Sequence, residues 1–263
     1  MTESLHLYLN SVRCELRRRS GWPWKRTVEG LPPAIWQAHD PNTLELMLPS
    51  GVRRGTALHV LLGAALCKFL VVDMPAEPID PAERTVAAEA RMRQQFALAP
   101  EDWNCTVDAG IGRGQATVCA VRSALLTRLR VLTAAHGLEL VSVRPYASVL
   151  WDVVCAKQMD GGQTGLLAIE EDAFTVITAR EARVVGLHSL QHNGATGVAE
   201  RELRRIGLSA GPAMRAAMWL AIPPQVSVGA DIDPARLLSV RELGDGAIEA
   251  DFRDLLLAAE AVA

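Results

Sequence analysis

Residues 81–146, PAERTVAAEARMRQQFALAPEDWNCTVDAGIGRGQATVCAVRSALLTRLRVLTAAHGLELVSVRPY, alternate helix and strand signals in one continuous run. Pro81 and Glu83 suit the first turn of a helix, because that turn tolerates proline and its dipole favours a carboxylate. Leucines then recur at helical spacing before Gly137, a typical residue beyond a helix C-terminus. The segment therefore predicts an α/β unit, in the order helix 82–93, strand 102–107, glycine-rich turn 110–114, strand 116–121, helix 122–136 and strand 138–143.

The N-terminal flank is predicted to be mostly strands. Only Asn10 and Ser11 separate the first two alternating segments, which favours a two-residue hairpin turn. Pro41 lies near the start of a segment that suits a short helix. The near-continuous apolar run 58–62 is typical of a buried central strand. The predicted elements are strands 5–9, 12–17 and 26–28, a helix over 41–48, and strands 58–62 and 68–72.

The C-terminal half repeats this order of signals without repeating the sequence. Its predicted elements are helix 146–157, a linker over 160–165, strands 166–170, 174–178 and 183–187, helix 198–206, strand 217–222 and helix 252–261. The three strands after the linker are joined by short turns, as in an antiparallel meander. We therefore predict a first lobe over residues 1–160 and a second, shortened lobe over residues 161–263.

Composition narrows the class of protein. A chain of 263 residues that is 49% hydrophobic can bury a substantial core. Its net charge of −3 gives no general attraction to nucleic acid, so a nucleic-acid partner is not expected. Five dispersed cysteines without a C-x-x-C pair predict reduced, buried thiols in the cytoplasm. Neither a signal peptide nor a spanning segment is predicted, so we expect a soluble protein.

The pattern resembles the actin/hexokinase-type ATPase fold, and within it the PilM-like and GspL-like proteins of type IV pilus and type II secretion systems. The resemblance is strongest from Leu58 to Val154, over the segments DWNCTV, VCAV and LVSVRP. It implies an α/β, two-lobed actin-like (ribonuclease H-like) fold. It also implies a cytoplasmic protein, peripheral to the inner membrane, that binds the short cytoplasmic tail of a membrane protein in a groove. The residues of that groove are not assigned by any motif.

The nucleotide-binding hairpins depart from the pattern of active members, which open each lobe with D-x-G-x-S/T. The first matching turn is Leu9-Asn10-Ser11-Val12, without acid or glycine, and the second is acidic but lacks glycine. Phosphate needs such backbone N–H groups and a metal-positioning acid. We expect a degenerate nucleotide site with no cofactor and no ATP hydrolysis. The alternative is an ATPase or switch that holds Mg²⁺ and ATP with Glu170, Glu171 and Asp172.

Other motifs favour structural roles. The glycine-rich turn 110–114 precedes a strand, whereas a dinucleotide loop precedes a helix, so a hairpin turn is expected. His188 and His192 have no visible third ligand, and surface positions are predicted for both. No G-x-S-x-G elbow occurs, and Cys119 lies in mid-strand. We predict neither a metal site nor covalent catalysis.

The basic first hairpin has two interpretations. Arg17, Arg18 and Arg19, together with Trp22 and Trp24, would suit contact with anionic lipid headgroups. The same residues would equally suit a solvated hairpin whose tryptophans fold back onto the lobe, which is the favoured interpretation.

The leading functional hypothesis, drawn from the resemblance, is a non-catalytic scaffold of a pilus or secretion platform. The nucleotide-binding enzyme or switch of the same fold is the rival. A small-molecule-binding α/β domain unrelated to secretion is a third alternative. The sequence leaves homo-oligomerisation and the identity of the machine open.

Overall fold

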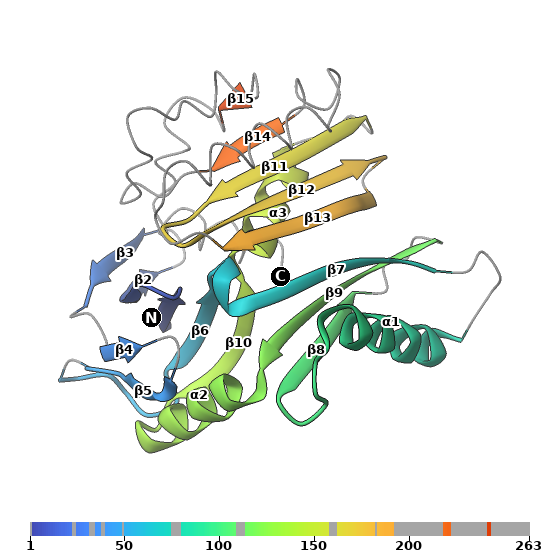
Figure 1. Cartoon of the computed structure of the whole chain (residues 1–263). Coiled ribbons are helices and arrows are strands. Elements are labelled where there is room, and N and C mark those ends of the chain that lie inside the picture. Colours follow the sequence, from blue (N-terminus) through green and yellow to red (C-terminus); the bar gives the residue numbers. More distant parts are fainter. Residues whose placement is uncertain are drawn as a thin grey trace.

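The structure, a computed structural model, describes residues 2–22, 25–31, 35–37, 40–48, 50–74, 80–108, 114–157, 162–181, 183–191, 218–221 and 241–242. These residues form two lobes, each built on a five-stranded mixed sheet (Figure 1). A three-stranded sheet and a two-stranded ribbon belong to the first lobe. Among the helices described, none is long and apolar enough to cross a bilayer.

The first-lobe sheet has the order β10-β6-β1-β2-β3. Its strands are β1 (Thr2–Leu9), β2 (Cys14–Trp22), β3 (Lys25–Gly30), β6 (Ala57–Leu62) and β10 (Glu139–Pro145). β1, β2 and β3 are antiparallel, whereas β6 runs parallel to both β1 and β10. Leu5, Leu7 and Leu9 are fully buried on one face, as the two-residue period of a strand requires. The predicted strands and the central place of β6 are confirmed.

The turn between β1 and β2 is wider than the predicted two-residue turn. Leu9 pairs with Cys14, so the loop comprises residues 10–13. The Asn10 side-chain oxygen accepts hydrogen bonds from the N–H groups of Val12 (2.9 Å) and Arg13 (2.6 Å). This local bonding stabilises a four-residue loop in place of the tight turn.

The predicted helix over 41–48 is wrong. β4 (Ile35–Gln37) pairs with β5 (Asp40–Glu45) in an antiparallel ribbon. Leu44 is fully buried, and its carbonyl accepts a hydrogen bond from the Arg128 guanidinium at 2.7 Å. Thr43 Oγ1 accepts a hydrogen bond from the Gln37 N–H at 2.9 Å. Strand pairing and this tertiary contact outweigh the weak local helix signal.

A three-stranded antiparallel sheet is inserted in the chain between β6 and helix α2 (Ser123–Ala135) of the first lobe. It has the order β7-β9-β8 and is covered on one face by α1. Its elements are a 3-10 turn (Ala64–Leu66), β7 (Cys67–Asp73), α1 (Pro81–Phe96), β8 (Trp103–Asp108) and β9 (Gln115–Arg122). Met92 of α1 packs against Val118 and Ala120 of β9, and all three are fully buried. The predicted helix and strands are confirmed here.

Two further helices follow. α2 (Ser123–Ala135) buries Leu125 and Leu129 in the core of the first lobe. It ends before Gly137, as predicted, and the φ of +65° at Gly137 is a left-handed conformation that glycine adopts readily. α3 (Tyr146–Lys157) has the predicted bounds. Val149 and Leu150 of α3 pack in one core cluster with residues of both lobes, so α3 joins the lobes.

The second-lobe sheet repeats the topology of the first, with the order β13-β12-β11-β14-β15. Its strands are β11 (Gln163–Ile169), β12 (Ala173–Arg180), β13 (Arg183–Gln191), β14 (Met218–Ala221) and β15 (Arg241–Glu242). β11, β12 and β13 are antiparallel, and β14 runs parallel to β11 and β15, as in the first lobe. The predicted meander is confirmed. The predicted linker is wrong over 163–165, which belong to β11. The predicted helices 198–206 and 252–261 lie outside the described residues.

Candidate functional site

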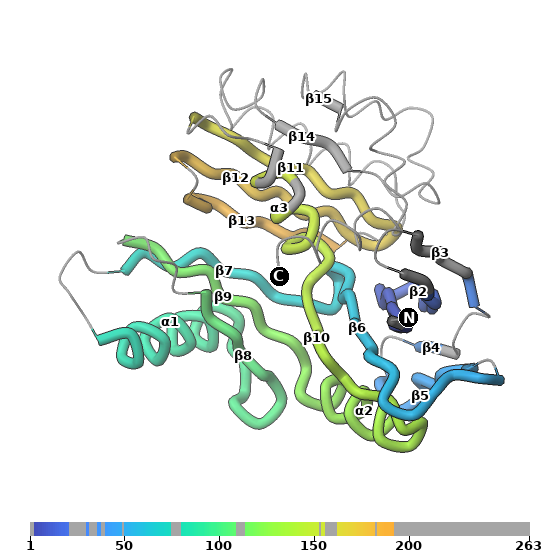
Figure 2. Tube along the Cα trace, turned by 180° about the vertical axis from the view of Figure 1, so that it is seen from behind, coloured from blue at the N-terminus to red at the C-terminus, as the bar shows by residue number. Residues whose placement is uncertain are grey.

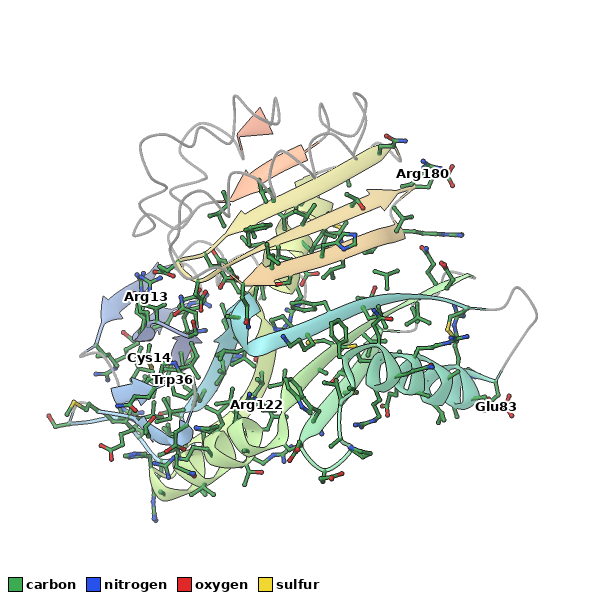
Figure 3. All side chains as sticks on the ribbon, in the orientation of Figure 1. Arg13, Cys14, Trp36, Glu83, Arg122 and Arg180 are labelled. Atoms are coloured by element: carbon green, nitrogen blue, oxygen red, sulfur yellow. The ribbon has the colours of Figure 1, made fainter. Side chains whose placement is uncertain are left out.

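The two loops that would be nucleotide-binding hairpins face each other across the lobe boundary. They are the β1–β2 loop (residues 10–13) and the β11–β12 loop (residues 170–172), and Figure 3 shows Arg13 where the lobes meet. Because β1 and β11 hold equivalent places in the two sheets, the repeated topology brings equivalent turns together. We call this region the hairpin junction.

Glu170 is the buried centre of the hairpin junction. Its side chain is fully buried, and Tyr8 Oη donates a hydrogen bond to Glu170 Oε2 at 2.6 Å. The Ala64 N–H donates to Glu170 Oε1 at 3.0 Å. The pKa of Glu170 is raised to about 8, chiefly by burial and to a smaller extent by the neighbouring Asp172 and Glu171, while the hydrogen bonds from Tyr8 and Ala64 oppose the shift. Glu170 is therefore largely protonated at neutral pH.

The other two acids are bound by the first-lobe loop. Asn10 Nδ2 donates to Glu171 Oε2 at 2.5 Å, and Arg13 Nε lies 3.1 Å from Glu171 Oε1. The Ser11 N–H donates to Asp172 Oδ2 at 2.6 Å. The carboxylates thus take up the donors that the first-lobe loop presents. The sequence pattern did not predict this arrangement, because it shows that the loop lacks glycine and acid but not that its donors face the second lobe.

Gly63 shows how closely the hairpin junction is packed. A Cβ atom at this position would lie 2.6 Å from both Asn10 Cβ and Glu170 Oε2. Only glycine allows the chain to pass here without displacing the loop or the acid. Within the described ranges, no group of three acid, histidine or cysteine side chains is arranged to hold a metal ion. The acids that the sequence offered as a magnesium site accept hydrogen bonds and an ion pair from protein donors.

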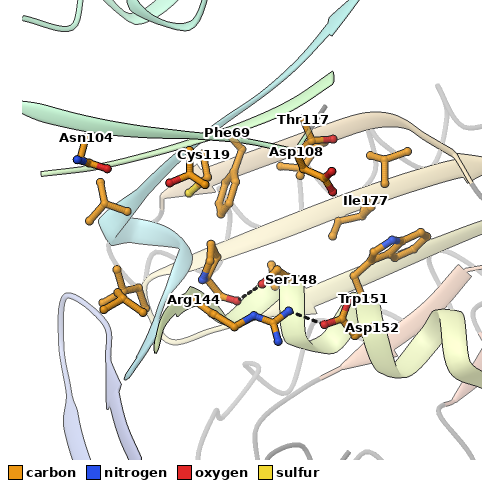
Figure 4. Close-up of a pocket in the computed structure, with 18 of the residues that line it drawn as sticks. Phe69, Asn104, Asp108, Thr117, Cys119, Arg144, Ser148, Trp151, Asp152 and Ile177 are labelled. Carbon is orange, nitrogen blue, oxygen red and sulfur yellow. Dashed lines mark hydrogen bonds and ion pairs between the residues drawn. The ribbon is translucent and has the colours of Figure 1, made fainter. Parts of the chain in front are cut away.

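A separate, open cleft of about 750 Å³ lies between the inserted sheet, the β10–α3 segment and the second lobe (Figure 4). Figures 1 and 2 both show β13 of the second lobe beside β7 of the inserted sheet. One wall is the sheet face turned away from α1, because alternate residues of β9 point to opposite faces. Its volume is in the range of ordinary ligand sites.

The cleft has apolar walls with charged groups among the lining residues. Large apolar residues come from four different elements, β7, α3, β12 and β13, and include Phe69, Trp151, Ile177, Val184 and Leu187. Arg144 and Asp152 form an ion pair along one wall (Figure 4). Arg130 on α2 and Asp108 on the edge strand β8 are both exposed and also line the cleft. Apolar walls with a few charges suit a short peptide segment better than a bare anion.

The basic hairpin is only partly available for membrane contact. Arg19 is buried, so it cannot reach lipid headgroups, which corrects its place in the predicted contact. Arg17 pairs with Glu15 at 2.5 Å and Arg18 with Glu3 at 2.8 Å. Trp24 and the side chain of Trp22 lie outside the described residues. The ion pairs favour the solvated-hairpin interpretation.

The remaining predicted sites have mixed outcomes. β8 and β9 form an antiparallel hairpin as predicted, although residues 109–113 of the turn lie outside the description. His188 is exposed as predicted, and His192 is not described. All five cysteines are free. Cys105 and Cys119 are half-buried and Cys155 is exposed, so the prediction of buried thiols holds only for Cys14 and Cys67. The pKa of the Cys67 thiol is raised, mainly by its hydrogen bond with Cys119 and also by burial. A raised pKa disfavours the reactive thiolate form of Cys67.

The cleft itself was not predicted. Its walls come from segments more than 100 residues apart, such as Phe69 and Val184, and no local motif marks them. The only available signal was the alternation of polar and apolar residues, with Asn104, Thr106 and Asp108 on β8 and Gln115 and Thr117 on β9. That pattern indicates a face without a covering helix but does not say what lies opposite.

No family model and no curated protein matches the sequence. Solved structures do match across nearly the whole chain. The cytoplasmic domain of EpsL, an inner membrane component of the type II secretion system of Vibrio cholerae, has a TM-score of 0.59 at 15% identity, over 100% of this chain and 96% of that one. A chain of the PilM–PilN type IV pilus biogenesis complex has a TM-score of 0.59 at 13% identity, over 98% of both chains.

A third match is a Bacteroides thetaiotaomicron protein with an actin-like ATPase fold and unknown function. Its TM-score is 0.61 at 8% identity, over 97% of this chain and 96% of that one. These likenesses establish an actin-like fold that resembles PilM and the EpsL cytoplasmic domain, as the sequence analysis expected.

Proposed function

We propose that this chain is a non-catalytic, cytoplasmic scaffold of an inner-membrane platform of the type II secretion or type IV pilus kind. The observation that carries the proposal is the pairing of an open apolar cleft with a hairpin junction closed by protein groups. The likeness to the EpsL cytoplasmic domain and to the PilM–PilN complex supports the kind of machine.

The cleft is the proposed groove for the cytoplasmic tail of a membrane partner. A tail segment would place an apolar side chain against Phe69 and Trp151, where burial contributes about 1.5–3 kcal/mol per large side chain. Arg130 at the border offers a charge partner for an acidic residue of the same segment. The partner then holds the scaffold at the membrane, so the scaffold needs no lipid anchor of its own.

The groove is tested by site-specific photo-cross-linking in the native cells. A cross-linking residue replaces Thr106, which is exposed and lines the cleft. The matched control replaces Val86, which is 67% exposed on α1 and does not line the cleft. We expect the Thr106 probe alone to capture the cytoplasmic segment of a membrane protein. Equal capture from Val86, or none from Thr106, would contradict the groove.

We propose the absence of catalysis because the donors of the first-lobe hairpin loop are already occupied by carboxylates of the second-lobe loop. Nucleotide phosphates would have to displace Glu171 and Asp172 from Asn10, Ser11 and Arg13. We expect isothermal titration with Mg-ATP to show no micromolar binding. The second candidate, a nucleotide-dependent switch, is favoured by the gathering of three acids at this point. A micromolar heat signal that disappears in Glu170→Ala or Asp172→Ala would establish that candidate.

A further inference from the structure

We propose that the hairpin junction is a self-liganded latch, in which carboxylates of the second lobe fill an anion-receiving loop of the first lobe and hold the lobes closed without a bound ligand. The latch consists of Asn10, Ser11 and Arg13 on one side and Glu171 and Asp172 on the other. The latch determines how the two lobes are held together, and this proposal does not depend on the proposed membrane partner.

The first-lobe loop has the donor set of an anion receptor. The Arg13 guanidinium forms an ion pair with Glu171, with Nε 3.1 Å from Oε1. The Asn10 amide and the Ser11 N–H donate hydrogen bonds to carboxylate oxygens at 2.5 and 2.6 Å. Asn10 Oδ1 accepts hydrogen bonds from the N–H groups of Val12 and Arg13, so bonds within the loop itself also fix its shape. Donors to charged acceptors are stronger than neutral ones, particularly where water is limited.

The loop and the acids are both held in place. Arg13 also lies over the Tyr8 ring, 5.3 Å from its centroid, and 3.6 Å from Glu15 on its own hairpin. On the other side, the Glu170 N–H donates to the Ala173 carbonyl at 2.7 Å and closes the second-lobe turn. Asp172 is 4% exposed, so its bond to Ser11 is shielded from water. Two preshaped halves of opposite charge therefore meet across the lobe boundary.

The latch explains why the first-lobe loop can lack glycine. A glycine-rich loop lets a free phosphate approach the backbone, whereas here the incoming anion is on the same chain at very high effective concentration. The loop needs only a few donors in the right places. Closure then becomes a property of the sequence and does not depend on the supply of nucleotide.

Charge exchange across the junction tests the latch. Arg13→Glu and Glu171→Arg should each accelerate amide hydrogen exchange in residues 9–13 and 170–173 by about tenfold or more, because each leaves like charges facing. Combining the two substitutions should restore much of the protection. Glu15→Gln is the matched control, because Glu15 pairs with Arg13 within the first lobe only. In this variant the amide exchange of residues 9–13 and 170–173 should change less than about twofold. Single variants without effect, or a double variant no better than the worse single, would overturn the latch.

Anion rescue provides a second, gentler test. Asp172→Ala leaves the Ser11 N–H without its carboxylate, and Asp172→Ser, whose side chain is also too short to replace the carboxylate, serves as a second variant if the alanine variant folds poorly. We expect added sodium formate to slow the exchange of the Ser11 region in either variant, relative to sodium chloride at equal ionic strength. The wild-type protein should not respond, because its site is filled. No difference between formate and chloride in both variants would refute the anion-receiving loop.

Discussion

Glu170 is the residue whose ionisation matters most for stability. Its folded-state pKa of about 8 exceeds the reference value of 4.5, so between these pH values the folded chain holds a proton that the unfolded chain has lost. The free energy of unfolding should therefore fall as pH rises through this window, by up to about 1.4 kcal/mol per pH unit. Glu170→Gln keeps the shape and removes this slope. Urea unfolding at about pH 6.5, 7.2 and 8 measures this slope.

The comparison is cleanest above pH 6.5. His6 has its pKa lowered from 6.5 to about 3 by burial and by the neighbouring His59, so it contributes a slope of the opposite sign that fades as pH rises through 6.5. The exposed Glu101→Gln variant controls for the loss of one carboxylate. Equal slopes in the wild type and in Glu170→Gln would show that Glu170 does not titrate in this range.

Gly63 gives a second prediction at the scale of one residue. Gly63→Ala places a Cβ atom 2.6 Å from Asn10 Cβ and from Glu170 Oε2, and overpacking of this kind costs about 1–3 kcal/mol. Gly30→Ala is the matched control, because a Cβ atom at Gly30 meets nothing within 4 Å. The midpoint of chemical denaturation should fall for the first variant only. A stable Gly63→Ala protein would mean that the hairpin junction is looser than its geometry indicates.

At the scale of elements, α1 is predicted to hold the inserted sheet. Met92→Ala removes a fully buried side chain between α1 and β9 and should cost about 2–5 kcal/mol. Val86→Ala, at a position 67% exposed on the same helix, should cost less than about 0.5 kcal/mol. Hydrogen exchange should show the loss concentrated in α1, β7, β8 and β9. Uniform loss over both lobes would indicate that the inserted sheet does not open as a separate unit.

The elements also show where sequence reasoning works. α3 and the β11–β13 meander were predicted because periodic apolar residues and short turns specify them locally. The helix predicted over residues 41–48 was wrong because the Leu44 carbonyl is bound by Arg128, 84 residues away, and no local pattern indicates that contact. The hairpin junction was not predicted for a similar reason. Asn10 and Glu171 were both noted, but their pairing depends on two lobes coming together.

At the scale of the whole molecule, the basic hairpin is predicted to contribute little to membrane attachment. An exposed basic residue near anionic lipid contributes about 1 kcal/mol, but Arg17 and Arg18 are already paired with Glu15 and Glu3. Replacing both arginines with glutamine should leave co-sedimentation with phosphatidylserine vesicles within about twofold of wild type.

The control for this experiment replaces the exposed Arg53 and Arg54 with glutamine, which makes the same change of net charge elsewhere. A salt-sensitive loss of vesicle binding only in the Arg17 and Arg18 variant would restore the lipid-contact interpretation. It would also mean that the ion pairs with Glu3 and Glu15 break at the membrane.

The insertion of a whole sheet between β6 and α2 has a consequence for the order of folding. β10 completes the first-lobe sheet by pairing with β6, and some 80 residues of chain separate the two strands. During synthesis, β7, α1, β8 and β9 must all leave the ribosome before that pairing is possible. The hairpin-linked β8 and β9 are nearby in sequence and can form early, whereas distant parallel pairing is slow. The first lobe therefore matures around its insertion, and its parallel edge is the last part of that sheet to close.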